Sequence, residues 1–466
     1  MKMTALEMTA AERHTVASLK RFLEYWTMEK GFAERFRADE ERTLGEIGLS
    51  ELGEDRESLR LLAFRELADS VKGKKPEELP PNFVLYRRFV NWKLRTRQEL
   101  QETGCAPEEP AFRAWRKRQI NRCWAELGTR NEAIVHTPLT FELALGCSVG
   151  CPFCGVMAGK LTKVFRGTEE NLKLWRQVLI KCRELIGGAA GDGTCYYATE
   201  PLDNPEYESF ASIYFEELGE VPQLTSAASM RNPERTRAYL KLAASQQERV
   251  HRFSVLSYEI FQKIMAFFTP DELLFVELLP QFAEAPACGF SGSGRARSYD
   301  CEKVVKNDGD TISCVTGFVI NMAEKSIRLS TPCGTDDEHP TGEIKIAREF
   351  FTDIDDFAAK LTGLRKKYFC KAFPKTQVLR LRPGTTIEKL ADGIIFRREN
   401  GFKLKFTGAD DLPAKYYLAI ADYLPEGRHT AYDIAGELMD KGLSPAQVFY
   451  ILDHFVAAGL LLEAYE

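Results

Sequence analysis

Hydrophobic residues in the first third of the chain recur at the spacing of an α-helix. In LKRFLEYWTMEKGFAERF one predicted face carries Leu19, Phe22, Leu23, Trp26, Phe32 and Phe36. The same helical spacing of hydrophobic residues recurs in ESLRLLAFRELADSV and YRRFVNWKLRTRQEL. The pattern predicts a helical region over residues 1–136. The basic run of its last segment is read as a solvated helix face, and the alternative is a face that contacts an acidic peptide; the run comprises Arg87, Arg88, Lys93, Arg95 and Arg97.

Residues 137–376 alternate between strand-like and helix-like segments. The predicted strands are TFELALG, CYYATEP, PQLTSAAS, HRFSVLS and LLFVELLPQ. The predicted helices between them are ENLKLWRQVLIKCRELI, ERTRAYLKLAASQQ and YEIFQKIMAFF. Two more strands, TISCVTGFVINM and KSIRLSTPC, follow a Gly/Ser-rich loop. This βαβα rhythm predicts an α/β fold with a parallel sheet or barrel.

The order of predicted strands and helices changes again over residues 377–466. Three short predicted strands, VLRLRPG, GIIFRR and FKLKF, precede three predicted helices, YYLAIADYL, TAYDIAGELMDK and SPAQVFYILDHFVAAGLL. The order βββααα predicts a compact, separate module.

Composition narrows the class of protein. The 466 residues are 44% hydrophobic and 28% charged, which is ordinary for a globular chain, and the net charge of -5 argues against nucleic-acid binding. No export signal or membrane-spanning apolar stretch is evident, so we expect a cytoplasmic protein. Its 12 cysteines are then expected to be reduced, and to serve in metal binding, catalysis or burial.

Three cysteines form the motif with the most specific chemistry. Cys147, Cys151 and Cys154 have the spacing C-x3-C-x2-C, and Gly150 and Pro152 favour a turn there. Three thiolates in one loop can bind three irons of a [4Fe–4S] cluster and leave the fourth iron open. A structural zinc site would need a fourth ligand, usually from a second C-x2-C unit, and the sequence contains none.

The motif, following the first strand of a βα series, resembles that of the radical S-adenosylmethionine superfamily. The resemblance implies a partial (β/α)6 barrel, a [4Fe–4S] cluster, S-adenosylmethionine and an external electron donor of the flavodoxin or ferredoxin type. It implies that Phe153 packs on adenine and that Glu200, in Thr199-Glu200-Pro201, holds the methionine amino group, although the two usual glycines are missing. Ser226 and Ser254 correspond to serines near the cofactor on the third and fourth strands.

The C-terminal segment, LRLRPGTTIEKLADGIIFRRENGFKLKF followed by three helices, resembles the winged-helix-like peptide-recognition module of enzymes that mature ribosomal peptides. Such modules bind the leader of a precursor peptide as an added strand. A DNA-binding winged helix is the alternative, but the last predicted helix has no Lys or Arg to contact phosphate.

The whole layout resembles the proteusin-type radical peptide epimerases, which convert L-residues to D-residues. The resemblance implies that an adenosyl radical removes the Cα hydrogen and that a cysteine thiol returns a hydrogen to the opposite face. Cys333, at the end of SIRLSTPC, is our expected donor because a strand's C-terminal end would lie near the barrel mouth. Cys370 is the second choice and Cys288 the third, whereas Cys314 is expected to be core. The alternatives are carbon–carbon or thioether crosslinking, or a non-catalytic leader-binding protein.

Overall fold

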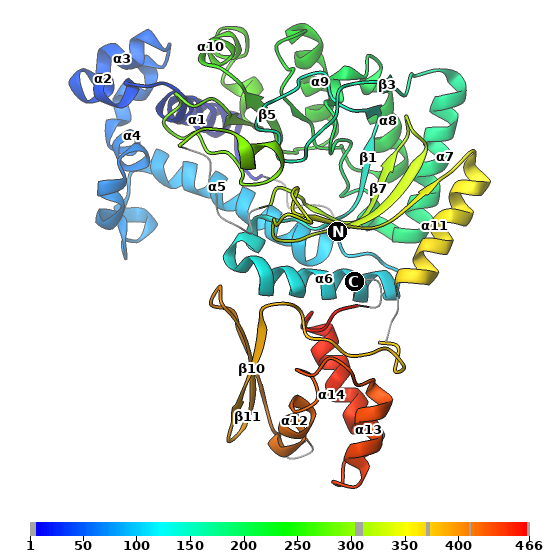
Figure 1. The fold of residues 1–466 in the computed structure, drawn as a ribbon. Helices are drawn as coiled ribbons and strands as arrows, with labels where there is room; N and C mark the ends of the chain where they lie inside the picture. Colours follow the sequence, from blue (N-terminus) through cyan, green and yellow to red (C-terminus); the bar gives the residue numbers. More distant parts are fainter. Residues whose placement is uncertain (1–5, 303–310, 370–372, 410–411, 464–466) are drawn as a thin grey trace.

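The computed structural model describes residues 6–302, 311–369, 373–409 and 412–463. The first part of the chain is helical, as predicted (Figure 1), with helices α1 (Ala10–Met28), α2 (Phe32–Ala38), α3 (Glu40–Glu46), α4 (Arg56–Ala63), α5 (Pro81–Glu99) and α6 (Pro110–Leu127). A capping box between Thr9 and Glu12 begins α1. The aromatic face predicted there is real, since Phe22, Phe32 and Phe36 are fully buried together.

The middle of the chain is a mixed α/β body, which confirms the predicted class. Its parallel strands follow one another in space: β1 (Thr137–Glu142), Thr194, β4 (Thr225–Ser226), β5 (His251–Val255) and β6 (Val276–Pro280). Thr194 is a one-residue position that bridges Thr140 of β1 on one side and Gln223, just before β4, on the other. The helices between them are α7 (Glu169–Ile186), α8 (Tyr207–Leu218), α9 (Pro233–Gln246) and α10 (Tyr258–Phe267). Leu139 and Phe141 of β1 belong to the main hydrophobic core, which also includes Trp175 of α7.

The next strand does not continue this row. Strand β7 (Val315–Asn321) pairs in parallel with β1, at the other end of the row from β6. Strands β8 (Ser326–Pro332) and β9 (Glu343–Phe350) then add antiparallel, and α11 (Ile354–Tyr368) follows. Strand β9 was not predicted. Within the described residues the strands do not close into a barrel.

The predicted strand CYYATEP (195–201) does not form, and the nearest pairing is at Thr194, the residue before it. Side chains of β1 replace the backbone ladder beyond that point: the Thr140 hydroxyl donates to the Tyr196 carbonyl over 2.9 Å, and Glu142 accepts from the Ala198 amide over 2.8 Å. The backbone N–H and C=O groups there have hydrogen-bond partners without a strand, so the strand predicted from the apolar residues is wrong.

The C-terminal part has the predicted order of three strands and three helices, but its first strand is displaced. The antiparallel sheet comprises β10 (Thr385–Leu390), β11 (Gly393–Arg398) and β12 (Lys403–Thr407), followed by α12 (Ala414–Ala421), α13 (Ala431–Met439) and α14 (Pro445–Ala457). The prediction of a strand at VLRLRPG is wrong. That segment forms isolated bridges at Val378 and Leu381, and Pro383 and Gly384 (φ +72°) turn the chain into β10 instead.

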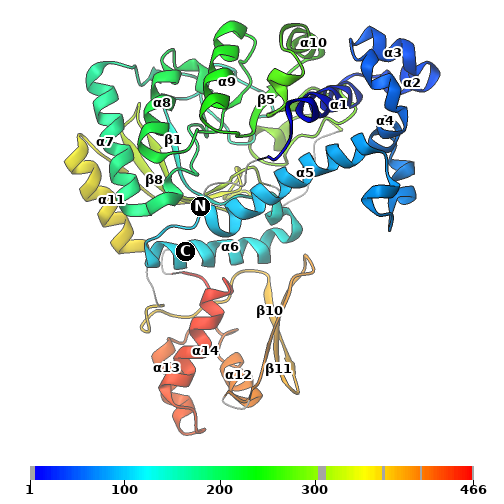
Figure 2. The ribbon, with the colours of Figure 1, turned by 180° about the vertical axis from the view of Figure 1, so that it is seen from behind.

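Helix α6 lies between the α/β body and this C-terminal unit (Figures 1 and 2). The C-terminal unit has its own hydrophobic cluster, and polar contacts connect it to α6: Asn121 donates to the Ala457 carbonyl over 2.7 Å, and Asn400 to the Ala125 carbonyl over 2.8 Å. Among the described helices, none has the length and apolarity to cross a bilayer.

Candidate cluster and cofactor site

The three motif cysteines share one loop with a fixed neck. The loop connects β2 (Ala144–Leu145) to β3 (Lys163–Val164), which pair antiparallel. At the neck, the Cys147 amide donates to the Gly159 carbonyl over 2.9 Å. Gly146 has φ +86°, and a side chain there would collide with the Lys160 carbonyl. Both ends of the loop are therefore held together where it leaves the sheet.

Inside the loop the cysteines are half-buried and turned by hydrogen bonds. The Cys154 amide donates to the Cys151 carbonyl over 3.3 Å, and Gly150 has φ +67°. Burial raises the pKa of the Cys151 thiol to about 11, and the nearby Cys154 and Cys147 contribute to that shift. The thiols are thus electrostatic neighbours. Among the described residues, however, no three Cys, His, Asp or Glu side chains converge closely enough to hold a metal ion.

Arg295 braces this loop from a distant part of the chain. Its amide donates to the Cys154 carbonyl over 2.9 Å, its Nε to the Cys151 carbonyl over 3.0 Å, and its Nη1 to the Ala158 carbonyl over 2.7 Å. Gly294 has φ +60°, and a side chain there would collide with the backbone of the cysteine loop. The Gly/Ser-rich segment, residues 288–300, therefore holds the cysteine loop in place, and we call it the supporting segment.

Phe153 also packs against this supporting segment. Its ring centroid lies 4.5 Å from that of Phe290 and 5.7 Å from that of Tyr299. The aromatic residue expected at adenine thus lies in an aromatic cluster next to the cysteines.

Glu200 lies in a polar cradle beside the loop. It is 4% exposed, accepts from the Ser226 hydroxyl over 2.6 Å, and accepts from the Ala227 amide over 2.8 Å. Burial raises the pKa of the Glu200 carboxyl, while these hydrogen bonds oppose the rise. The oxygen that accepts from Ser226 also accepts from the Leu202 amide over 3.2 Å, so the other carboxylate oxygen is the one that keeps a lone pair for a ligand.

The cradle and the cysteine loop are close together. Burial raises the pKa of the Cys147 thiol, and the carboxylates of Glu200 and Asp203 raise it further. Asp203 links the cysteine loop to Arg231, because it accepts from the Ser148 amide over 2.8 Å and forms an ion pair with Arg231 at 3.2 Å. Ser254 is half-buried on β5, one residue beyond Phe253, the partner of Ser226 across the sheet. Ser226 and Ser254 therefore stand on neighbouring strands, and Glu200, which Ser226 contacts, lies near Cys147.

Cys333 lies elsewhere. Because β8 runs antiparallel to β7, its C-terminal end meets the edge where the parallel strands β1 and β7 begin. The expectation that this strand end lies at the barrel mouth is therefore wrong. Cys333 is 5% exposed, and burial raises the pKa of its thiol, with Arg122 and Cys123 of α6 among its neighbours.

The other candidate cysteines, where described, differ in location and exposure. Cys370 lies outside the described residues. Cys288 is half-buried, at the start of the supporting segment. Cys314 was expected to be core, but it is partly exposed and borders a cavity; burial raises its thiol pKa to about 11.

Sequence reasoning missed Asp203, Arg231 and Arg295. Asp203 stands in LDNPEY, whose composition indicates only a loop. Arg295 stands in a Gly/Ser-rich stretch with no periodic pattern. All three act on backbone or side chains far away in the sequence, so no local signal marks them.

Comparison with known proteins finds a relative that aligns with nearly the whole chain. No family model matches the chain, and no solved structure matches it. The "Uncharacterized protein y4wI" of Sinorhizobium fredii (strain NBRC 101917 / NGR234) is 30% identical over 464 residues, covering 98% of this chain and 89% of the relative. The chain therefore belongs to the same family as y4wI.

Proposed function

We propose that this protein is a radical S-adenosylmethionine enzyme that epimerises L-residues of a ribosomally made precursor peptide to D-residues. The observation that carries the proposal is the placement of Cys147, Cys151 and Cys154 in one glycine-turned loop beside the Glu200–Ser226 cradle. The row of parallel strands β1, Thr194, β4, β5 and β6, in chain order, is the arrangement that a partial barrel requires.

The proposed cluster ligands are the three thiols, which share one loop but do not converge on a common point among the described residues. The three cysteines would ligate a [4Fe–4S] cluster, and three thiolates leave one iron open. When bound, the reduced cluster supplies the electron that cleaves S-adenosylmethionine to methionine and a 5′-deoxyadenosyl radical. Glu200 would accept from the amino group of S-adenosylmethionine, and Ser226 keeps Glu200 oriented. Ser254 would contact the ribose, and Phe153 the adenine.

A thiol must return a hydrogen atom to the peptide Cα radical in this reaction, so it must carry its proton. The thiyl radical that remains would be restored to the thiol by one electron from the external flavodoxin- or ferredoxin-type donor and one proton from solvent. Cys333, our first expectation, lies at the edge where β1 and β7 begin, opposite the edge at which the cysteine loop follows β1. Cys314 borders a cavity at that same edge. Among the described cysteines the proposed donor is therefore Cys288, our third choice, which is half-buried and belongs to the segment that supports the cysteine loop.

The proposed partner is the leader of the precursor peptide, bound at the edge strand β12. A groove with a volume of about 750 Å³ separates α6 from the C-terminal unit; Phe402, Leu404 and Phe406 line it on one side, and Tyr450 and His454 of α14 on another. Lys403 and Lys405 are exposed between these apolar positions. A peptide added to β12 would place alternate side chains in the groove. We expect Leu404→Asp to weaken leader binding about tenfold or more in fluorescence polarisation, and Lys403→Ala to leave it unchanged.

The reaction is tested with the reduced, reconstituted enzyme and its precursor peptide in D2O. Each inverted residue is expected to gain one Cα deuterium, a mass increase of about one unit, because the returning hydrogen comes from an exchangeable thiol. Crosslinking would instead remove two hydrogens for each link. D-residues without solvent deuterium would refute the thiol donor. A protein that forms no 5′-deoxyadenosine would support the leader-binding alternative.

A further inference from the structure

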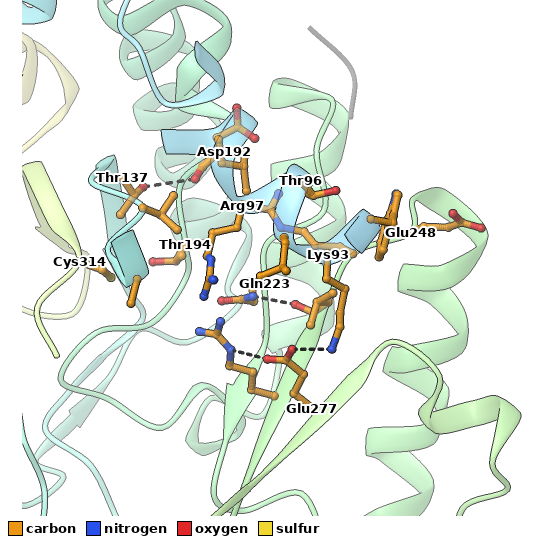
Figure 3. Close-up of a pocket in the computed structure, with 18 of the residues that line it drawn as sticks. Lys93, Thr96, Arg97, Thr137, Asp192, Thr194, Gln223, Glu248, Glu277 and Cys314 are labelled. Atoms are coloured by element: carbon orange, nitrogen blue, oxygen red, sulfur yellow. Dashed lines mark hydrogen bonds and ion pairs between the residues drawn. The ribbon is translucent and has the colours of Figure 1, made fainter. Parts of the chain in front are cut away.

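A cavity of about 260 Å³ lies at the edge of the α/β body where the parallel strands begin (Figure 3). Three polar residues of neighbouring strand positions line its wall: Thr137, which begins β1, Thr194, and Gln223, which bridges Thr194 just before β4. Helix α5 covers it with Lys93 and Arg97, among others. The cysteine loop follows β1 at the opposite edge, so this cavity is distinct from the proposed cofactor site.

Much of the charge in this cavity is already paired. Glu277 accepts from Lys93 over 3.1 Å and from Arg252 over 3.3 Å. Glu248 pairs with Arg13 of α1. These groups hold α1, α5 and the strands together and do not require a ligand.

Two guanidinium groups in the wall, those of Arg97 and Arg249, keep N–H donors that make no hydrogen bond among the described residues. Across the described residues, the Arg97 side chain has no hydrogen bond or ion pair, and Figure 3 shows it reaching from α5 into the cavity. Arg249 is 8% exposed, and its Nη1 has no hydrogen-bond partner in that same set. The nearest carboxylate oxygen to this nitrogen belongs to Glu220, 3.8 Å away. A buried guanidinium with an unsatisfied N–H is costly unless an acceptor arrives.

The remaining wall indicates the size and charge of that acceptor. Val90, Leu100, Val135 and Val250 provide an apolar surface. The cavity also contains Asp192, whose carboxylate makes no hydrogen bond or ion pair within the described residues. Burial raises the pKa of this carboxyl to about 6, and the Arg249 guanidinium opposes the rise. That carboxylate opposes a dianion such as phosphate more strongly than a monoanion.

We propose that this cavity binds a small organic monocarboxylate, with its carboxylate on Arg97 and Arg249 and its apolar body against the valine and leucine side chains. A planar guanidinium matches a carboxylate in geometry and charge. The site does not depend on the cluster or on the proposed epimerase activity. It adds a small-molecule site at the edge of the sheet where parallel α/β proteins do not usually place catalysis.

The test uses the full chain in isothermal titration calorimetry with hexanoate as the probe and hexanamide as its uncharged counterpart. Hexanoate is expected to bind and hexanamide to bind at least about tenfold more weakly, because only the former pairs with guanidinium. Arg97→Gln should weaken hexanoate binding about tenfold or more. The matched control is Arg95→Gln, an exposed position on α5 outside the cavity wall.

Arg97→Lys separates charge from shape, and we expect it to retain part of the affinity. Circular dichroism on each variant checks that the fold is intact. The proposal is overturned if no hexanoate binding occurs, if hexanamide binds equally well, or if Arg97→Gln and Arg95→Gln bind hexanoate alike. Tighter binding of inorganic phosphate than of hexanoate would overturn the assignment to a monocarboxylate.

Discussion

Replacing Arg295 by methionine removes the brace of the cysteine loop but keeps most of the side chain's apolar stem. The change deletes the side-chain hydrogen bonds to the Cys151 and Ala158 carbonyls, at 3.0 and 2.7 Å. The backbone bond from the Arg295 amide to the Cys154 carbonyl stays. The loop that carries all three proposed cluster ligands therefore loses the side-chain half of its support.

The size of the effect follows from those two bonds. A hydrogen bond from a charged donor contributes about 1.5–3 kcal/mol, and partial exposure of Arg295 favours the low end. At about 1.5 kcal/mol for each of the two bonds, we expect the ordered loop to be destabilised by about 3 kcal/mol, which corresponds to about a 150-fold change in the equilibrium between the ordered and the open loop. Cluster retention, rather than the global melting temperature, should show this loss, because the bonds are local.

The assay is iron and sulfide content per chain after anaerobic reconstitution and a timed challenge with a chelator. Arg295→Met should lose its cluster much faster than the wild type. Arg297→Met is the control, since Arg297 lies two residues away and pairs with Asp337 at 3.3 Å instead of with the cysteine loop. Equal retention in all three proteins would refute the bracing role.

Three further predictions concern Glu200, Asp192 and Phe455. Glu200→Gln should weaken S-adenosylmethionine binding about tenfold without changing iron content, measured by equilibrium dialysis. Asp192 has its pKa raised from 3.8 to about 6, so its contribution to stability is present below about pH 4 and is lost as pH rises through 6. Asp192→Asn should therefore be more stable than the wild type at pH 8, by at most about 3 kcal/mol in denaturant unfolding, and the gain should vanish near pH 4; a gain independent of pH would contradict this. Phe455→Ala removes a ring 4.9 Å from both Phe396 and Phe406 and should cost the C-terminal unit about 3–5 kcal/mol, seen as an earlier unfolding transition. The exposed Met439→Ala should leave that transition unchanged.

The proposed donors are compared directly by substitution. Cys288→Ala should leave 5′-deoxyadenosine formation intact and abolish the deuterium-labelled D-residue, detected by mass spectrometry and chiral amino-acid analysis. If Cys288→Ala still gives labelled D-residues while Cys333→Ala does not, the donor is Cys333.

Local patterns predicted the parts of the fold that local physics determines. The amphipathic helices of the first third and the three C-terminal helices followed from periodicity, and the α/β class from the alternation of elements. The strand at CYYATEP failed because Thr140 and Glu142, distant in sequence, satisfy the backbone there. The first C-terminal strand failed because the turn at Gly384 starts the sheet later than the apolar run suggests.

The residues of the candidate site also divide into those that local sequence signals identify and those that long-range contacts determine. Cys147, Glu200 and Ser226 could be found because each carries a motif or stands at a predicted strand end, and the structure brings them together. The position of Cys333 could not be found, since the direction of β8 depends on pairing with β7, a long-range property. Arg295 could not be found either, because its three acceptors lie over a hundred residues away in sequence.

The central claim, that Cys147, Cys151 and Cys154 hold a cluster that cleaves S-adenosylmethionine, is tested most directly by product analysis. Reconstituted and chemically reduced protein is incubated anaerobically with S-adenosylmethionine, and 5′-deoxyadenosine is quantified by liquid chromatography and mass spectrometry. We predict 5′-deoxyadenosine from the wild type and from Cys301→Ala, a half-buried cysteine outside the motif, and none from Cys151→Ala. Absence of 5′-deoxyadenosine from an iron-loaded wild type, or equal formation by Cys151→Ala, would contradict the claim.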